Sequence, residues 1–503
     1  MAASTIETLR EGFKDGAVQL RQSWRNAPAT ARRIKADPRS VVKGAALAPL
    51  LVLYGHSLLD AIDRSGFTTI LPEIQDSFDI SDEQITSIAG VALFVSLLLG
   101  VPTAYYSDKG KKRTWWLALG AVLAAIFSMI TGLAASVAMF VFGRAAFGLG
   151  LRVNDPVQAS LLSDYYAVDT RPTTFAGRQG MDNAGQLIGP LFFGFVTMLI
   201  DWRVAVCAIA VPAVILAVLS LRLPEPARGA PEREAMGLAP DAPYEEEESA
   251  KFIESMRILH KITTVRRLYF ALPFLVGGVL GIGILFPLFL EDVFGLSAGE
   301  RGVLTSVTNI AGILGLFFGV PIARRYLVSG NPEGMLELIR LAGILTAVFL
   351  AGIAVSPTLP LMVVVGLLFY FSASLFVPTA GTVIAMVVPP RVRGVGFAML
   401  GLWALPGLFM LPVAAGIAEA YGDRWGMVVG LPLFVIGSFI IASGKTSLRR
   451  DIESAFAAAM SAATVPAPSA ETEVIEPVPA PTAARPRRER PLAARTSEDV
   501  PQP

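Results

Sequence analysis

The sequence predicts an all-α membrane protein in which about twelve transmembrane helices form two six-helix bundles around a central cavity. The first observation is composition: of the 503 residues, 53% are hydrophobic and 17% charged, whereas soluble domains are nearer ~45–50% and ~25%. The second is a series of long apolar runs, such as 88–106 and 428–443, since about 20 apolar residues cross a bilayer as a helix. The third is a repeat of the first half in the second.

The apolar runs fall into two groups of six. In the first bundle (45–222) we expect spans at 45–71, 85–106, 114–135, 137–161, 178–200 and 203–222. In the second (267–445) we expect 267–290, 301–323, 335–356, 359–386, 393–417 and 426–443. The remaining segments are an amphipathic and basic N-terminus (1–44), a charged linker with a membrane-surface amphipathic helix (223–266) and an Ala-, Pro- and Glu-rich tail (446–503) that is predicted to be disordered.

Lysine and arginine placement sets the orientation. Basic residues gather in the connections after spans 2, 4, 8, 10 and 12, and the opposite connections are acidic or nearly neutral. We therefore expect both termini to be cytoplasmic, in a bacterial inner membrane. A net charge of +1 gives no indication of a nucleic-acid partner, and the single Cys207 forms no intrachain disulfide. We expect a monomer whose tail is available to a cytoplasmic partner.

The repeat is most visible in two Gly-Val-Pro sequences. "GVPTAYY" begins at Gly100 and "GVPIARRY" at Gly319, each closing the second span of its half. Weaker ordered matches lie on either side. A parallel six-span repeat is typical of transporters whose halves rock about a central site.

Span 1 carries four ionisable residues: His56, Asp60, Asp63 and Arg64. At about 3.6 residues per turn, the first three share a helix face with Arg64 at its edge. Because ionisable groups are costly in hydrocarbon, they are functional candidates. We expect Asp63 to couple protons with Arg64 as its local partner, while Asp60 remains a second candidate that can pair with Arg64 four residues on. The alternatives are a static clamp within the helix and, for His56, packing or hydrogen bonding.

Several motifs carry a family resemblance. They are "SDKGKKR" (107–113), "GRAAFGLG" (143–150), "GQLIGPLFFG" (185–194) and "DAIDRSGFTTILPEIQDSF" (60–78). Together these resemble the major facilitator superfamily over about 45–445, and the last resembles its Spinster-like branch. Lys111 replaces a glycine of the first motif, and Leu151 stands where the branch has a glutamate. The resemblance implies the superfamily fold and lipid-type substrates.

The resemblance also implies roles for span 4. Arg144 would face the cavity, where it binds an anionic group or pairs with the span 1 carboxylate. Gly148, Arg152 and Asp155 share its face. Arg152 and Asp155 form the expected structural pair, although a permanent Arg144–Asp155 pair is the alternative.

Other candidates are gate and packing residues. A cytoplasmic gate is expected at Asp108, Lys109, Lys112 and Arg113, and a second gate or cap at the four-apart pair Arg178 and Asp182. Helix packing is expected at Gly100, Gly148, Gly185, Gly189 and Pro190.

The second half supplies little charge. Asn309 is its main buried polar residue, and aromatic residues such as Phe286, Phe369 and Trp403 suggest an apolar cavity wall. A charged wall facing an aromatic wall suits an amphipathic substrate with an acidic or zwitterionic head.

The predicted function is secondary active transport by alternating access, with proton-coupled export of an amphipathic or lipid-like molecule. The alternatives are a drug or small-metabolite proton antiporter and a non-transporting sensor. No phosphate loop, zinc-protease or serine-hydrolase motif is present, so we expect no enzyme. With two histidines and one cysteine we expect no metal site. No cofactor is expected, and the proton gradient would supply the energy.

Overall fold

A computed structural model describes residues 7, 9–22, 25, 46–109, 112–167, 170–228, 230–231, 252–388 and 392–464. Every regular element within these ranges is a helix, which confirms the all-α prediction. Residues Met1–Ala458 form one compact unit, and a second begins at Ala459. All that follows concerns the first unit.

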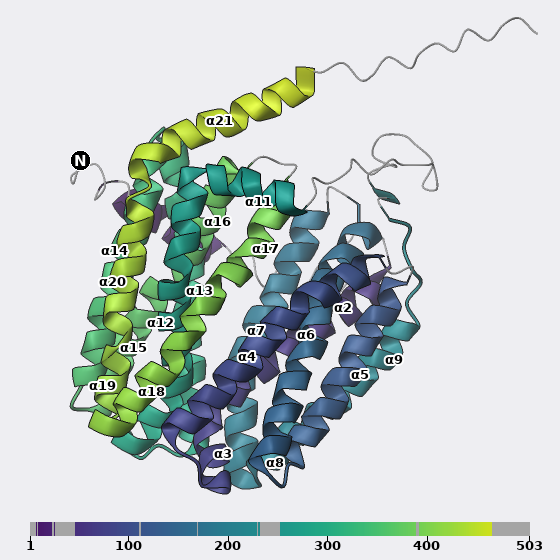
Figure 1. The fold of residues 1–503 in the computed structure, drawn as a ribbon, viewed down its shortest axis with the longest axis vertical. Helices are drawn as coiled ribbons and strands as arrows, with labels where there is room; N and C mark the ends of the chain where they lie inside the picture. The colour runs from purple at the N-terminus through teal and green to yellow at the C-terminus, as the bar shows by residue number, and fades with distance from the viewer. Residues whose placement is uncertain are drawn as a thin grey trace, which may run out of the picture. The chain divides into compact units, whose positions relative to one another are not determined.

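The first half of the chain contributes α2 to α9, which lie together on one side of Figure 1. Their bounds are α2 Leu47–Thr69, α3 Leu71–Phe78, α4 Asp82–Lys109, α5 Arg113–Gly132, α6 Val137–Tyr165, α7 Arg171–Leu199, α8 Trp202–Ala208 and α9 Ala210–Leu221.

The second half contributes α11 to α21. Their bounds are α11 Phe252–Lys261, α12 Thr263–Phe294, α13 Ala298–Val328, α14 Glu333–Val355, α15 Leu359–Ser374, α16 Phe376–Val387, α17 Arg393–Ala404, the 3₁₀ turn η3 Leu405–Phe409, α18 Met410–Tyr421, α19 Asp423–Val428, α20 Gly430–Ala442 and α21 Lys445–Thr464. We call the end of the bundle with α3, α8 and α19 the α3 end, and the opposite end the α11 end (Figure 1).

Eight helical stretches in the described residues are long and apolar enough to cross a membrane. Four further long helices, α2, α4, α6 and α7, occupy the places of the other predicted spans. The structure is therefore consistent with the predicted twelve. Charge explains why α2 is not among the eight, since it carries Asp60, Asp63 and Arg64.

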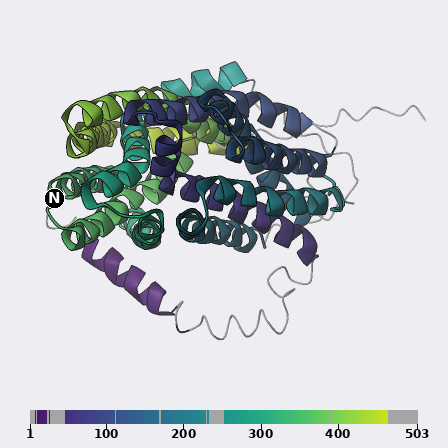
Figure 2. The same ribbon diagram turned by 90° about the horizontal axis from the view of Figure 1, so that it is seen from below.

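One predicted boundary and one predicted surface differ from the structure. α21 continues to Thr464, so residues 446–464 of the predicted disordered tail are helical. α11 coincides with the predicted amphipathic helix. Its Leu259 was expected to face the membrane surface, but it is buried in the protein core. Within the N-terminal segment, residues 9–22 form a helix (purple in Figure 2) that packs Phe13 against Phe318 of α13, with ring centroids 5.6 Å apart.

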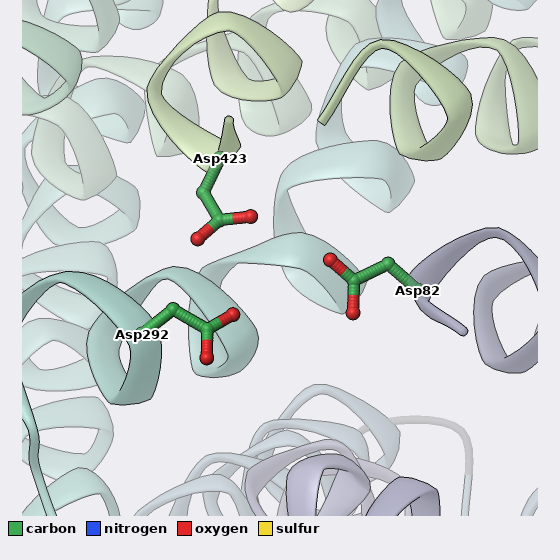
Figure 3. A group of neighbouring side chains, drawn as sticks. All are labelled: Asp82, Asp292 and Asp423. Carbon is green, nitrogen blue, oxygen red and sulfur yellow. The ribbon is translucent and has the colours of Figure 1, made fainter. Parts of the chain in front are cut away.

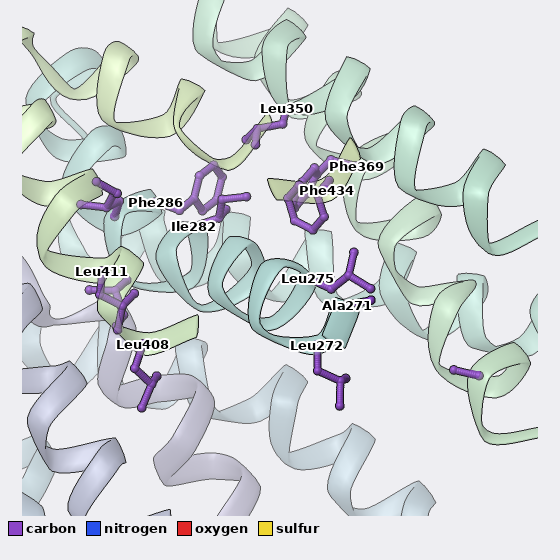
Figure 4. Close-up of a cluster of buried hydrophobic side chains, with 14 of the residues drawn as sticks. Ala271, Leu272, Leu275, Ile282, Phe286, Leu350, Phe369, Leu408, Leu411 and Phe434 are labelled. Atoms are coloured by element: carbon purple, nitrogen blue, oxygen red, sulfur yellow. The ribbon is translucent and has the colours of Figure 1, made fainter. Parts of the chain in front are cut away.

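The second half is held together by a continuous apolar core. Figure 4 shows its centre, where Leu275 and Ile282 of α12 meet Phe369 of α15 and Phe434 of α20. Phe286 is also buried here. The predicted aromatic cavity wall is therefore corrected for Phe286 and Phe369, because burial in the core leaves their rings no free face.

Close backbone packing fixes α2 against α7. A Cβ on Gly185 would lie 2.6 Å from the carbonyl oxygen of Leu58, and one on Gly189 would lie 2.4 Å from that of Ile62. Farther along α7, the Pro190 carbonyl oxygen lies 2.3 Å from where a Cβ of Gly302 on α13 would be. Small residues thus allow α7 to contact α2 on one side and α13 on the other.

We predict that Gly189→Ala destabilises the protein by roughly 1–3 kcal/mol, because the added methyl group overpacks the α2–α7 contact against backbone atoms. The midpoint of thermal unfolding in detergent measures the effect. Gly180→Ala is the matched control, since Gly180 also lies in α7 and a Cβ there meets nothing within 4 Å. Equal midpoints for the two variants would contradict the close packing.

Candidate functional site

An ion pair between α2 and α6 forms the centre of the site. Arg144 donates from both terminal nitrogens to Asp63, over 3.1 Å to Oδ1 and 2.9 Å to Oδ2. The Asp63 side chain is 1% exposed and that of Arg144 16%. A bidentate guanidinium–carboxylate pair is the geometry that best compensates two charges removed from water. The partner of Asp63 is therefore Arg144, which is one of the two roles that the resemblance implied for this arginine. The expectation that Arg64 is the local partner of Asp63 is wrong, because Arg64 pairs with Asp182.

Two aromatic rings enclose the same guanidinium. The Arg144 Cζ lies 3.6 Å from the ring centroid of Phe67 on α2 and 4.8 Å from that of Phe147 on α6. Both distances are within the range of cation–π attraction. Sequence analysis missed these residues because each reads as an ordinary apolar position in a membrane span.

The ion pair lies in the wall of a cavity of about 250 Å³ between the two halves of the chain. Its lining comprises Asp60, Asp63, Arg64, Phe67 and Thr68 of α2, Leu71 of α3, Ala89, Ala92 and Leu93 of α4, Arg144, Phe147 and Gly148 of α6, and Leu280 and Ile284 of α12. Every charged residue in this lining comes from the first half. The second half contributes two aliphatic side chains, so the apolar wall is aliphatic where aromatic residues were predicted.

Arg64 is the more accessible arginine of the cavity. Its side chain is 54% exposed, and it pairs with Asp182 of α7 over 2.6 Å. The predicted Asp60–Arg64 pair is therefore corrected to an interhelical pair. Asp182 also accepts a hydrogen bond of 2.8 Å from Gln186, on its other carboxylate oxygen.

Asp60 belongs to a polar network that joins α2, α6 and α7. Gln158 of α6 donates to Asp60 over 3.4 Å and accepts from Ser57 over 2.7 Å. Arg178 donates to Ser57 over 3.2 Å. The predicted Arg178–Asp182 pair is not formed between these described side chains. Both residues lie about two and three turns inside α7, which begins at Arg171, so they do not cap its end.

Three further candidates lie outside the cavity lining. His56 is buried, with its Nε2 2.9 Å from Ser220 Oγ of α9. Asn309 of α13 donates to the Gln186 carbonyl over 2.7 Å and so joins the two halves. Trp403 stacks on Tyr269, with ring centroids 5.9 Å apart. The structure therefore places all three in packing and interhelical contacts.

The predicted gate at the end of α4 is described in part. Arg113 is buried and bonds to Asp164 of α6 and to Glu225 over 2.9 Å. Burial raises the pKa of Glu225, but hydrogen bonds from Thr114 and Arg113 outweigh it and hold that pKa below its usual value. Because Asp164 belongs to the first bundle and Glu225 to the start of the linker that follows it, these contacts of Arg113 do not join the two bundles.

Lys112 is exposed at the start of α5. The surroundings of five other candidates lie outside the described residues: Gly100, Asp108, Lys109, Arg152 and Asp155.

Arg301, at the α3 end, is a residue that sequence analysis missed. Its side chain is 0% exposed and pairs with Glu73 of α3 and, over 2.9 Å, with Glu291 of α12. It also donates to the Thr69 carbonyl at the end of α2 over 3.4 Å. One buried cation thus ties the two halves together. One signal is present in the sequence, since Arg301 follows the acidic "LED" segment and begins a span. This connection counts among the acidic or nearly neutral ones that set the orientation, so Arg301 was not singled out.

Three carboxylates lie near this contact. Asp82 of α4, Asp292 of α12 and Asp423 of α19 point toward one another (Figure 3), with one oxygen of each within 4.8 Å of the others. Gln75 donates to Asp82 over 2.7 Å. Like charges at this spacing repel, so the closed seam at the α3 end depends on shared protons or nearby cations. Nothing else in the described structure marks the group as a metal site.

Comparison with known proteins places the chain in a structural context. A family model for the Major Facilitator Superfamily matches residues 53–404. The crystal structure of a bacterial homolog to the human lysosomal transporter Spinster, inward-facing and unoccupied, has a TM-score of 0.67 at 20% identity, over 80% of this chain and 97% of that one. The nucleoside transporter NupG (D323A mutant) gives 0.63 at 14% identity, over 80% and 99%. At these identities the structures bear on the fold alone.

Curated relatives match over shorter segments. The lincomycin resistance protein of Streptomyces lincolnensis is 30% identical over 178 residues, which are 35% of this chain and 36% of that protein. The triacylglyceride transporter of Mycobacteroides abscessus is 27% identical over 176 residues, 34% of each chain. The matches therefore span about a third of these relatives.

We predict that Arg301→Ala opens the α3 end. Removing one partner of a buried pair costs about 3–5 kcal/mol, enough to redistribute two conformations of similar energy. Spin labels at the exposed Asp76 and Glu419, in a Cys207→Ser background, report the separation of the halves, and a longer-distance population is expected.

Two variants keep this test interpretable. Glu73→Gln, which leaves Arg301 and Glu291 in place, should give a smaller shift in the same direction. Arg340→Ala removes a half-exposed pair with Glu337 inside α14 and should give none. An unchanged distribution of the distance between the two spin labels in Arg301→Ala would show that Arg301 does not hold the α3 end closed.

Proposed function

The chain belongs to the major facilitator superfamily and is a membrane transporter, and we propose that it exports an amphipathic or lipid-like molecule in exchange for protons by alternating access. The observation that carries this proposal is the buried Asp63–Arg144 pair in the wall of a cavity between the halves. Asp63 is the proposed proton carrier, because a guanidinium stays charged at physiological pH.

The contacts between the halves support alternating access. Arg301 closes the α3 end, and Ser306 of α13 donates to the Leu187 carbonyl of α7 over 2.7 Å farther along the seam. By the distribution of basic residues, the α3 end would face away from the cytoplasm. The described conformation would then be closed outside. Rocking to the opposite state requires the Arg301 contacts to break.

Exchange against protons restricts the substrate head group. A purely anionic head that binds Arg144 favours protonated Asp63, so substrate and proton would move in the same direction. A cationic group that binds ionised Asp63 competes with the proton, so the two move in opposite directions. Export driven by an inward proton gradient therefore favours a zwitterionic head, with its cation at Asp63 and its anion at Arg144.

The apolar part of the cavity suits the rest of such a molecule. Leu280 and Ile284 of α12 face the charged wall, and Ala89, Ala92 and Leu93 of α4 adjoin it. Burial of an alkyl chain there is favourable by about 0.8 kcal/mol per methylene. Similarity to proteins named triacylglyceride transporters supports a lipid-like substrate.

A drug–proton antiporter is the second candidate. Similarity to a lincomycin resistance protein favours it, and a cationic drug would compete with the proton at Asp63 by the same linkage. A thermal-shift screen of lysolipids, fatty acids and cationic drugs, with Arg144→Ala in parallel, separates the two. Stabilisation by a zwitterionic lipid that vanishes in the variant supports lipid export. Stabilisation by small cationic drugs that is indifferent to Arg144 supports the second candidate.

We predict that Asp63→Asn abolishes transport driven by a pH gradient in proteoliposomes while the protein still folds, because the amide cannot carry the proton. Asp79→Asn, in an exposed turn after α3, is the control and should transport normally. Uphill movement by Asp63→Asn would reject the coupling role. A non-transporting sensor would show no gradient-driven flux even in the unmodified protein.

We also predict that Arg144→Ala weakens binding of acidic or zwitterionic ligands more than of neutral ligands of the same chain length, by roughly tenfold or more for the loss of a charge-assisted contact. Calorimetric titration of each pair of ligands measures the difference. Equal loss for both would indicate structural damage to the cavity, not removal of a head-group contact.

A further inference from the structure

Arg144 has two independent sets of contacts, and only one of them involves Asp63. The carboxylate holds the edge of the guanidinium through two hydrogen bonds. Phe67 holds its face, with Cζ 3.6 Å from the ring centroid, and Phe147 adds a second ring at 4.8 Å. We infer that Phe67 is a positioning residue, which keeps the Arg144 guanidinium in the cavity wall when Asp63 is neutralised.

The Phe67 ring is itself fixed by contacts that do not involve the ion pair. It is buried and stacks on Phe140 of α6, with centroids 6.2 Å apart and planes inclined by 18°. Phe140 in turn contacts Phe78 at 5.6 Å and Trp202 at 6.2 Å. A proton on Asp63 therefore changes none of the contacts that hold the ring in place.

The contact with the rings matters because the cavity lining contains a second carboxylate besides Asp63. Asp60 lines the same cavity on α2, and Arg64 beside it is held by Asp182 of α7. Without the rings, a guanidinium that lost Asp63 could turn toward Asp60 or toward water. Cation–π attraction is insensitive to the proton on Asp63, so it holds the charge where it was.

The consequence deepens the proposed function and rests on it. In the exchange cycle Asp63 is lost as a partner twice, once to a proton and once to the cationic group of the substrate. In both states the guanidinium stays over Phe67, with its edge free for an anionic group. Phe67 would thus determine affinity for the anionic part of the head group without touching it.

Side-chain NMR of the full-length protein in detergent tests the inference without any ligand. The Nε–Hε resonance of Arg144 can be identified by its loss in Arg144→Lys. The ring currents of Phe67 and Phe147 should displace it upfield from the position of an exposed arginine. In Asp63→Asn this displacement should persist, and in Asp63→Asn with Phe67→Leu it should fall to the smaller contribution of Phe147. Phe67→Tyr, which keeps the ring face, should restore it.

Phe193→Leu is the matched control, since Phe193 of α7 is buried in the same apolar cluster, whereas the rings against Arg144 are Phe67 and Phe147. Combined with Asp63→Asn it should leave the Arg144 resonance displaced. A return of the resonance to the exposed-arginine position in Asp63→Asn alone would overturn the inference. So would a displacement of undiminished size in the Asp63→Asn, Phe67→Leu double variant.

A binding measurement separates this inference from the proposed function. Phe67→Leu should weaken the binding of a lysophosphatidylcholine by about tenfold, within the range of a cation–π contact, and should leave the binding of a monoacylglycerol of the same chain length unchanged. Equal weakening of both lipids would count against Phe67 as a positioning residue. If the unmodified protein binds neither lipid, the proposed substrate class fails, and the NMR result still decides the role of Phe67.

Discussion

The site depends on the cost of placing a carboxylate inside a membrane protein. Asp63 is 1% exposed, and an isolated charge at that depth would be strongly unfavourable. The bidentate contact with Arg144 removes most of this cost, and it does so between α2 and α6 of one bundle. A proton or a cationic group can take the place of Arg144 as the neutralising partner, but one of the three must be present. Under the exchange proposed above, that requirement would couple proton binding to substrate binding.

The helix that carries Asp63 also reaches the closed end of the bundle. Phe67 lies one turn beyond Asp63, the Thr69 carbonyl accepts from Arg301, and α3 follows directly with Glu73. Contact with Gly185 and Gly189 prevents α2 from shifting independently of α7. In the proposed alternating access, a change at Asp63 would therefore act on α2 and α7 together, and this pair would move against α13 as one body.

The sequence predicted the helical fold, the superfamily and its Spinster-like resemblance, and it identified both members of the Asp63–Arg144 pair. It failed where charges were paired by their spacing along one helix. Four-apart spacing suggested Asp60–Arg64 and Arg178–Asp182, but the structure pairs Arg64 with Asp182 across α2 and α7. Such pairs along one helix are worth only about 0.2–0.5 kcal/mol, so a facing helix readily provides a better partner. Arg301 shows the same limit, since its partners come from α3 and α12.

The two ion-pair systems differ in which halves they join, and this assigns them different parts of a transport cycle. Asp63 and Arg144 belong to one bundle, so rocking of the halves would leave their contact geometrically intact. Only the binding of a proton or a cationic group at Asp63 would change it. Arg301 and Glu73 belong to different bundles, so rocking must separate them, along with Asp82 from Asp292 and Asp423. Separation would relieve the repulsion between Asp82 and the other two carboxylates while it breaks the attraction of Arg301. Because the two effects oppose each other, they would reduce the free-energy difference between the states of the proposed cycle, which a substrate or a proton then has to reverse.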